Sequence, residues 1–240
     1  MTMMDALTRL GEPFLGDLQS LYANQPQTGL DGKSYAIDAS TRISVEEGLF
    51  LHDSCRNAAM TATLEVGMGY GFSTTFLLAA LDANGGGRHI AIDPYQHSDW
   101  DGIGESRMAS LLPRTQNLKH HDFTLIHDRS DHAAIDLERS GASFDLLFID
   151  GYHRFDDVLI DVYLLTRLCR PDGLIVLHDL WLPSVQAVQS FLCHNRPDLQ
   201  PIPTSCTNLA VFRRRDTDQR NWDHFVPFPM AFEIEMASES

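Results

Sequence analysis

The sequence is poor in positive charge. Of its 240 residues, 18 are Lys or Arg and 33 are Asp or Glu, which gives a formal net charge of −15. Proteins that bind nucleic acid need a basic surface to contact the phosphates. This charge balance therefore argues against a nucleic-acid partner.

Cysteines and long apolar runs are also scarce. No apolar run reaches the length of a membrane span, and the first residues lack the basic and apolar regions of a signal peptide. No two cysteines form a C-x-x-C pair, which indicates reduced, unpaired thiols. We therefore expect a cytoplasmic protein without a membrane partner. The four cysteines are Cys55, Cys169, Cys193 and Cys206.

The first 60 residues have the features of a helical extension. Leucines and a phenylalanine recur at helical spacing between Leu7 and Leu21, which predicts an amphipathic helix. Farther along, Ser44 and Glu47 match a capping box and predict a helix that runs to about Ala59.

The length suits one main domain with an extension. We expect a helical cap over residues 1–60, a main domain over 61–215 and a tail over 216–240. Aromatic residues in the tail predict that it packs on the domain.

Strands and helices alternate in the central part of the chain. This order predicts an α/β fold, with a doubly wound, mostly parallel sheet of seven strands. The predicted strands cover residues 63–66, 89–92, 123–127, 144–149, 174–177, 199–204 and 209–213. The predicted helices cover 73–81, 105–112, a segment from 132, 158–168 and 184–194, and Arg170-Pro-Asp-Gly173 is expected to form the turn before the fifth strand.

The stretch at 63–74 reads Thr-Leu-Glu-Val-Gly-Met-Gly-Tyr-Gly-Phe-Ser-Thr. A short apolar strand breaks into glycines, and a helix follows. This order opens a nucleotide-binding βαβ unit. Glycine lets the chain turn tightly and a ligand approach the backbone, while the helix offers free N–H groups.

The spacing of the glycines differs from the dinucleotide pattern G-x-G-x-x-G. The third glycine comes one residue early, and Phe72 stands in its place. The resulting E-x-G-x-G-x-G pattern resembles motif I of the class I S-adenosylmethionine-dependent methyltransferases. A glycine-rich turn of another α/β protein is the alternative. The resemblance implies a Rossmann-like fold and S-adenosylmethionine as cofactor, bound by Glu65, Gly67, Gly69, Gly71 and Ser73.

Two further positions are candidates for the cofactor site. Asp93 ends the second strand, where an acid commonly binds ribose hydroxyls; alternatively it is a turn residue before Pro94. After the third strand, the resemblance implies a polar residue near adenine. Ser130 or Asp131 would serve, and either could instead cap the next helix.

Acids also end the fourth and fifth strands, at Asp150 and Asp179. In the strand order of the resembling family these strands are neighbours, so the two carboxylates should lie together. Adjacent carboxylates repel unless a proton or a metal intervenes. Mg²⁺ prefers such oxygen ligands.

The segments Ile-Asp-Gly-Tyr-His and Leu-His-Asp around these acids resemble the macrocin O-methyltransferase and cephalosporin-biosynthesis methyltransferase group. The resemblance implies that Asp150 is a metal ligand that also serves catalysis and the cofactor site. It implies that His153 is the general base, and that His178 and Asp179 complete the ligands. His178 replaces the expected Glu and suits softer metals than Mg²⁺. Strand-end residues that merely hold loops are the alternative.

The remaining histidines show no spacing typical of metal ligands, and we expect surface or packing roles for them. Tyr95, His97 and Trp100 lie in a long loop after the second strand. Such loops carry binding residues, so these three could line a substrate pocket, or they could pack the loop.

Together these features predict an S-adenosylmethionine-dependent O-methyltransferase that acts, with a divalent cation, on a small-molecule hydroxyl. A sugar, a catechol or a natural product would fit. The alternatives are a nicotinamide-dependent oxidoreductase and a non-catalytic partner protein on the same fold. A homodimer through the N-terminal helices is compatible with the sequence.

Overall fold

The computed structural model describes residues 3–229. Its seven main strands form one mostly parallel sheet in the order β5-β4-β3-β6-β7-β9-β8, and a separate hairpin pairs β1 with β2. The predicted α/β fold class is confirmed. The chain forms two compact units, residues 1–133 and 134–240. Over residues 3–229, none of the helices combines the length and the apolar character needed to cross a membrane.

The first unit begins with short helices. The predicted N-terminal helix is interrupted at Gly11, whose φ of 71° lies in the left-handed region that favours glycine. The capping box is confirmed, because the Ser44 hydroxyl accepts from the Glu47 N–H and the Glu47 carboxylate accepts from the Ser44 N–H. The elements are α1 (Met3–Leu7), η1 (Thr8–Leu10), α2 (Phe14–Tyr22), β1 (Gln27–Thr28), β2 (Ser34–Tyr35), η2 (Ala39–Thr41) and α3 (Val45–Asn57).

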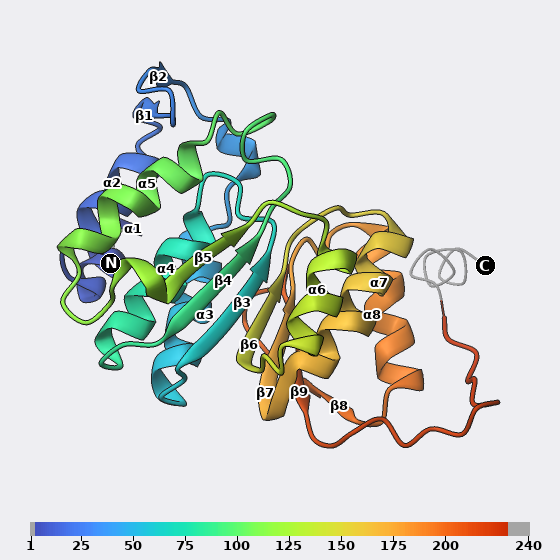
Figure 1. Ribbon diagram of the computed structural model, residues 1–240. Coiled ribbons are helices and arrows are strands. Elements are labelled where there is room, and N and C mark those ends of the chain that lie inside the picture. Colours follow the sequence, from blue (N-terminus) through green and yellow to red (C-terminus); the bar gives the residue numbers. More distant parts are fainter. Residues whose placement is uncertain (1–2, 230–240) are drawn as a thin grey trace. The chain divides into compact units, whose positions relative to one another are not determined.

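Three parallel strands follow in this unit, and Figure 1 shows them side by side in the order β5-β4-β3. Every residue of β3 is buried, as expected for a parallel strand covered on both faces. Helix α4 is buried over residues 72–82 and packs against α3. The elements are β3 (Ala62–Val66), α4 (Phe72–Ala83), β4 (Arg88–Ile92), α5 (Ile103–Leu111), η3 (Leu112–Arg114), η4 (His120–Asp122) and β5 (Phe123–Ile126).

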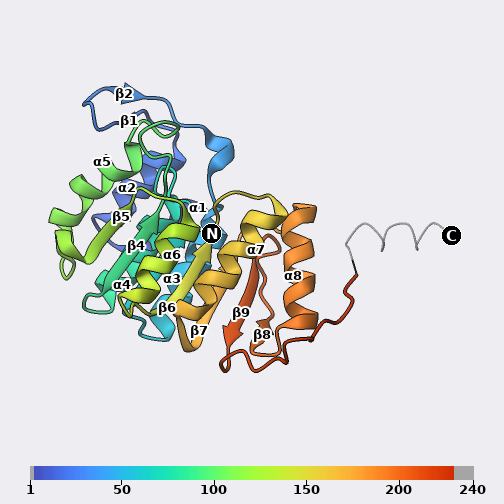
Figure 2. The ribbon, with the colours of Figure 1, turned by 45° about the vertical axis from the view of Figure 1, so that its right-hand side comes forward.

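The second unit holds the other four strands, after α6 (Ser130–Arg139) crosses the unit boundary. β6 and β7 are parallel, whereas β9 is antiparallel to both β7 and β8. Helices α7 and α8 lie side by side in Figure 2 and contact each other. The elements are β6 (Phe144–Ile149), α7 (Phe155–Leu165), η5 (Thr166–Leu168), β7 (Cys169–Leu177), α8 (Pro183–Asn195), β8 (Leu199–Ile202) and β9 (Ala210–Arg214).

Strand β7 is longer than predicted. The expected turn at 170–173 lies inside it, and the pairing of β6 with β7 shifts register between Phe144 and Leu146. Asp172 has a φ of 62°. The Pro-Asp-Gly segment thus forms an irregular stretch within the strand, which sequence patterns do not distinguish from a turn.

The described part of the tail is held to α8 at specific points. The Asn195 side chain bonds both the N–H and the carbonyl of Val226, at 2.7 and 2.8 Å, and Phe228 packs on Phe191 with ring centroids 5.6 Å apart. Trp222 instead is 98% exposed. Phe232, which the sequence also assigned to the packed tail, lies outside the described residues.

We predict that Gly48→Ala destabilises the protein by about 1–3 kcal/mol, the usual cost of overpacking a core. A Cβ at Gly48 of α3 would lie 2.1 Å from Cε2 of the buried Phe76 of α4. Denaturant unfolding measures the effect. Gly16→Ala in α2 is the matched control, because its Cβ would meet only the end of the Glu12 side chain, at 3.2 Å. Equal stability of the Gly48 variant and the wild type would contradict this packing.

Candidate functional site

The glycine turn between β3 and α4 needs its three glycines. Gly67, Gly69 and Gly71 have φ values of 86°, 51° and 81°, which other residues adopt only with strain. Gly71 is the N-cap of α4. The first turn of this helix therefore starts directly at the turn, with N–H groups that can face a ligand.

Glu65, just before the turn, is fully buried. The Ser73 hydroxyl donates to its carboxylate at 2.6 Å, the Thr74 hydroxyl donates to its other oxygen, and His89 Nε2 lies 3.1 Å away. His89 Nδ1 in turn lies 2.8 Å from the Thr63 hydroxyl. Glu65 and Ser73 thus bind each other inside the protein, and their direct contact with a cofactor stays a prediction.

Asp93, at the end of β4, also binds the glycine turn. It is 3% exposed. Its carboxylate accepts from the N–H groups of Gly69 and Tyr95 and from the Gln96 amide, each at 2.9 Å. The Gln96 amide also donates to the Gly69 carbonyl at 2.6 Å. Sequence reasoning missed Gln96, which is fully buried and whose Oε1 has no hydrogen-bond partner.

A buried arginine also contacts this turn. Arg107 of α5 donates to the Tyr70 carbonyl and forms an ion pair with Asp17 of α2. Burial lowers the Arg107 pKa, and the Asp17 carboxylate opposes that shift. The N-terminal extension therefore takes part in fixing the glycine turn, and no motif in the sequence marks this pair.

Ser130 and Asp131 lie at the start of α6. Asp131 accepts from Arg129 Nε at 3.0 Å, and this bond lowers the Asp131 carboxyl pKa. An adenine contact for Ser130 stays a prediction.

In the second unit, Asp150 and Asp179 converge as expected, because β6 and β7 are parallel neighbours with Ile149 opposite Leu177. His153 lies between them. Its Nε2 is 2.9 Å from Asp179 Oδ2 and 3.4 Å from Asp150 Oδ1. These are ion-pair distances, but the orientation gives the buried Nε2 no hydrogen bond. Donor atoms of these three residues all lie within 4.8 Å of one another.

His178 also lies close to both acids. Its Nδ1 lies 2.9 Å from Asp150 Oδ1 and 3.2 Å from Asp179 Oδ1, and its Nε2 lies 3.3 Å from the Asn208 amide nitrogen. Asn208 Oδ1 accepts from the Trp181 N–H at 3.3 Å, which fixes the orientation of the amide. In the neutral ring, His178 Nε2 would accept from this amide and Nδ1 would donate to Asp150. His153 and His178 thus both lie against the two acids, and a metal-ligand role for His178 stays a prediction.

The charges in this cluster shift one another. The neighbouring carboxylates of Asp150 and then of Asp179 raise the pKa of His153 to about 9, against the effect of burial. Burial acts to raise the pKa of Asp179, but interactions with His153 and His178 dominate and hold it far below its usual range. At neutral pH His153 is thus an imidazolium, which cannot accept a proton, and its role as base stays a prediction.

A groove of about 640 Å³ lies beside this cluster. Trp181, a lining residue that is 68% exposed, donates from its indole to Asp179 Oδ1 at 3.0 Å, so this side chain lies between the groove and the carboxylate. The lining residues are Leu180, Trp181, Gln186, Gln189, Ser190, Thr207, Asn208 and Pro229.

Comparisons with known proteins agree with this fold. Residues 64–180 match a family model described as a methyltransferase domain. No curated protein matches the sequence significantly.

Solved structures resemble the chain over most of its length. The O-methyltransferase TomG from Streptomyces achromogenes, in complex with SAM, is 19% identical, with a TM-score of 0.60 and coverage of 88% of this chain and 90% of TomG. SAH-bound PaMTH1 from Podospora anserina is 14% identical, with a TM-score of 0.61 and 88% coverage of both chains. The Bacillus cereus O-methyltransferase with SAH is 18% identical, with a TM-score of 0.57 and coverage of 88% and 91%.

These structures share the fold, and the family model covers the glycine turn as well as Asp150 and Asp179. The chain thus shares the fold of these structures, and its residues 64–180 are similar to a methyltransferase domain.

Proposed function

We propose that the protein is an S-adenosylmethionine-dependent methyltransferase that methylates a small-molecule hydroxyl. The observation that carries the proposal is the glycine turn of the first unit, held in a left-handed geometry by Asp93 and Gln96. The family-model match over residues 64–180 supports it. So does the fold shared with O-methyltransferases that bind SAM or SAH.

The residues present fit this cofactor. Gly67, Gly69 and Gly71 carry no Cβ, and the first two are only partly buried. Gln96 Oε1 is a buried acceptor without a partner, a rare feature in native proteins. S-adenosylmethionine, when bound, supplies the methyl group on its sulfonium. The protein's part is to position the two reactants, since a displacement needs close and aligned approach.

The second unit provides a cation site that fits. Asp150, His153 and Asp179 offer two carboxylates and one imidazole within a short span. We propose that they hold a divalent cation, which would polarise an acceptor hydroxyl and lower its pKa. His178, whose Nδ1 also faces both acids, would either join the ligands or orient the acids, as hydrogen-bonded neighbours of metal ligands do. Mixed oxygen and nitrogen donors admit Mg²⁺ as well as Mn²⁺ or Zn²⁺.

His153 has two candidate roles, metal ligand and general base. A single Nε2 atom cannot bind a cation and accept a proton at once. The short distances from this nitrogen to both acids favour the ligand role. The base role is the second candidate, and metal analysis of a variant separates the two.

The groove beside Asp179 is the proposed acceptor site. Trp181 offers an exposed aromatic face, and polar side chains of Gln186, Gln189 and Asn208 offer hydrogen bonds. Aromatic walls with a few polar groups are typical of sites for small molecules. A sugar, a catechol or another natural product with a hydroxyl would fit this chemistry.

A nicotinamide-dependent oxidoreductase is the rival function, and cofactor titration decides between them. We expect S-adenosylhomocysteine to bind and NAD not to bind, because Phe72 occupies the position of the third glycine of a dinucleotide site. Isothermal titration calorimetry of the full chain with each ligand measures this. Binding of NAD alone would overturn the proposal, and binding of neither would favour a non-catalytic partner protein.

We predict that Asp93→Ala weakens S-adenosylhomocysteine binding by about 1.5–3 kcal/mol, the scale of hydrogen bonds to a charged group. The carboxylate both orders Gly69 and stands where ribose hydroxyls bind in related folds. Calorimetry measures the affinity, and circular dichroism checks the fold. Asp99→Ala in the same loop, at an exposed position, is the matched control. An unchanged affinity in a folded Asp93 variant would remove Asp93 from the site.

We predict that EDTA abolishes methyl transfer and leaves S-adenosylhomocysteine binding largely intact. Asp179→Asn should have the same effect, because an amide keeps the shape and loses the charge. Re-addition of Mg²⁺, Mn²⁺, Co²⁺ or Zn²⁺ identifies the ion. His153→Gln should lose bound metal if His153 is a ligand and retain it if His153 is the base.

The exposed Asp156→Asn at the start of α7 is the control for these variants. Full activity of a sample shown by elemental analysis to be metal-free would refute the cation site. The two acids and His153 would then act as a proton-sharing group.

A further inference from the structure

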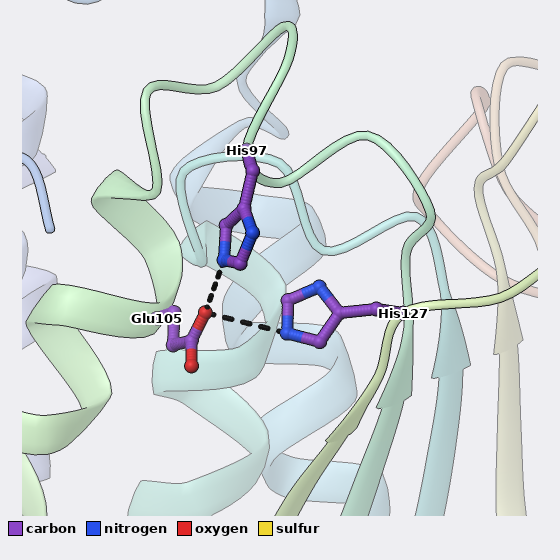
Figure 3. A group of neighbouring side chains, drawn as sticks. All are labelled: His97, Glu105 and His127. Atoms are coloured by element: carbon purple, nitrogen blue, oxygen red, sulfur yellow. Dashed lines mark hydrogen bonds and ion pairs between the residues drawn. The ribbon is translucent and has the colours of Figure 1, made fainter.

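A second group of metal-ligating side chains lies in the first unit. His97 comes from the loop after β4, Glu105 from α5 and His127 from the position after β5. Figure 3 shows both imidazoles pointing at the Glu105 carboxylate. None of the three belongs to the motifs on which the proposed methyltransferase function rests.

The distances are close to those of a coordination shell. His97 Nε2 lies 2.8 Å and His127 Nε2 lies 3.3 Å from the same oxygen, Oε2 of Glu105. The two rings are 4.5 Å apart between centroids. Ligands of a tetrahedral Zn²⁺ at about 2.0–2.2 Å are separated by roughly 3.3 Å. Small rotations of the side chains would place one ion among all three.

The backbone segments that carry the three residues are tied together. The N–H of Gly102, the N-cap of α5, donates to the Gln96 carbonyl at 2.6 Å, which links the residue before His97 to the helix that bears Glu105. The Asp93 N–H donates to the Ile126 carbonyl at 3.0 Å, next to His127. Ligand residues whose backbone is already held in place lose little conformational entropy when a metal binds.

An ion pair alone explains the arrangement poorly. One carboxylate can balance one imidazolium, while a second imidazolium 4.5 Å away would repel the first. The side chains are also 60%, 35% and 37% exposed, for His97, Glu105 and His127, so simple ion pairs there contribute little stability. Two neutral imidazoles with one carboxylate suit a divalent transition metal. The exposure of the three side chains lets such an ion reach them.

We propose that His97, Glu105 and His127 bind Zn²⁺, with water in the fourth position. Two imidazoles and a carboxylate form a ligand set that zinc sites use, and nitrogen donors favour Zn²⁺ over Mg²⁺. The bound ion would clamp the loop after β4 to α5 and β5. Gln96, adjacent to His97, contacts Gly69 and Asp93, so the clamp would also stiffen the glycine turn.

The test is a Zn²⁺ titration of the metal-stripped full chain, without a histidine tag, in the wild type and in His97→Asn, Glu105→Gln and His127→Asn. Each variant should bind one zinc ion fewer, or bind it at least about tenfold more weakly, the minimum loss known even for outer partners of metal ligands. The Asp150 group is unchanged in all three variants, so any zinc bound there is common to every sample. His132→Asn is the matched control, because His132 is 61% exposed and pairs with a single carboxylate, Asp128.

Histidine side-chain NMR of the wild type gives a second, variant-free readout. We expect Zn²⁺ to shift the Nε2 resonances of His97 and His127, with no such shift for His132. Mg²⁺ at the same concentration should leave all of them unchanged. Unaltered zinc stoichiometry and affinity in the three variants, or unmoved Nε2 resonances of His97 and His127, would overturn the proposal. Either result is distinguishable from failure of the methyltransferase function, because neither measurement uses activity or the cofactor.

Discussion

The structure of the first unit depends on one buried carboxylate. Glu65 has no access to water, and an ionised carboxylate in such a place is costly unless hydrogen bonds satisfy it. Ser73 and Thr74 from the first turn of α4, and His89 from β4, provide those bonds. The helix start, two adjacent strands and the intervening turn are therefore linked through a single group.

This link explains why the turn can hold three residues in left-handed conformations. A positive φ at Gly67, Gly69 and Gly71 costs little free energy because glycine has no Cβ. A flexible turn would, however, lose conformational entropy when it binds a ligand. Glu65 binds Ser73 and Thr74 at the end of the turn, and Asp93 accepts from the Gly69 N–H within it. Arg107 contacts it at the Tyr70 carbonyl. The turn therefore loses its conformational entropy during folding and not on binding, so it is preorganised for a ligand.

The sequence predicted those features that are encoded locally. The capping box at Ser44, the glycine turn, the apolar strands and their terminal acids all follow from residue type and spacing. Features that depend on contacts between distant segments were not predictable in this way. Gln96 is an ordinary loop residue until folding brings it to Gly69, 27 positions away, and the Arg107–Asp17 pair spans 90 positions. The pairing of His97 with Glu105 and His127 likewise arises only in three dimensions. The length of β7 was missed because an irregular strand and a turn share the same Pro-Asp-Gly composition.

Charge balance gives the clearest account of the acidic cluster in the second unit. Asp150 and Asp179 face two imidazoles, those of His153 and His178. The two acids raise the pKa of His153 to about 9, and the two histidines hold the pKa of Asp179 far below its usual range. A proton on His153 thus offsets negative charge in a largely buried setting, where uncompensated charge is unfavourable. A divalent cation with a neutral His153 would balance both carboxylates. The raised pKa of His153 therefore reflects the same excess of negative charge that would attract a cation, and proton and cation compete for the same nitrogen.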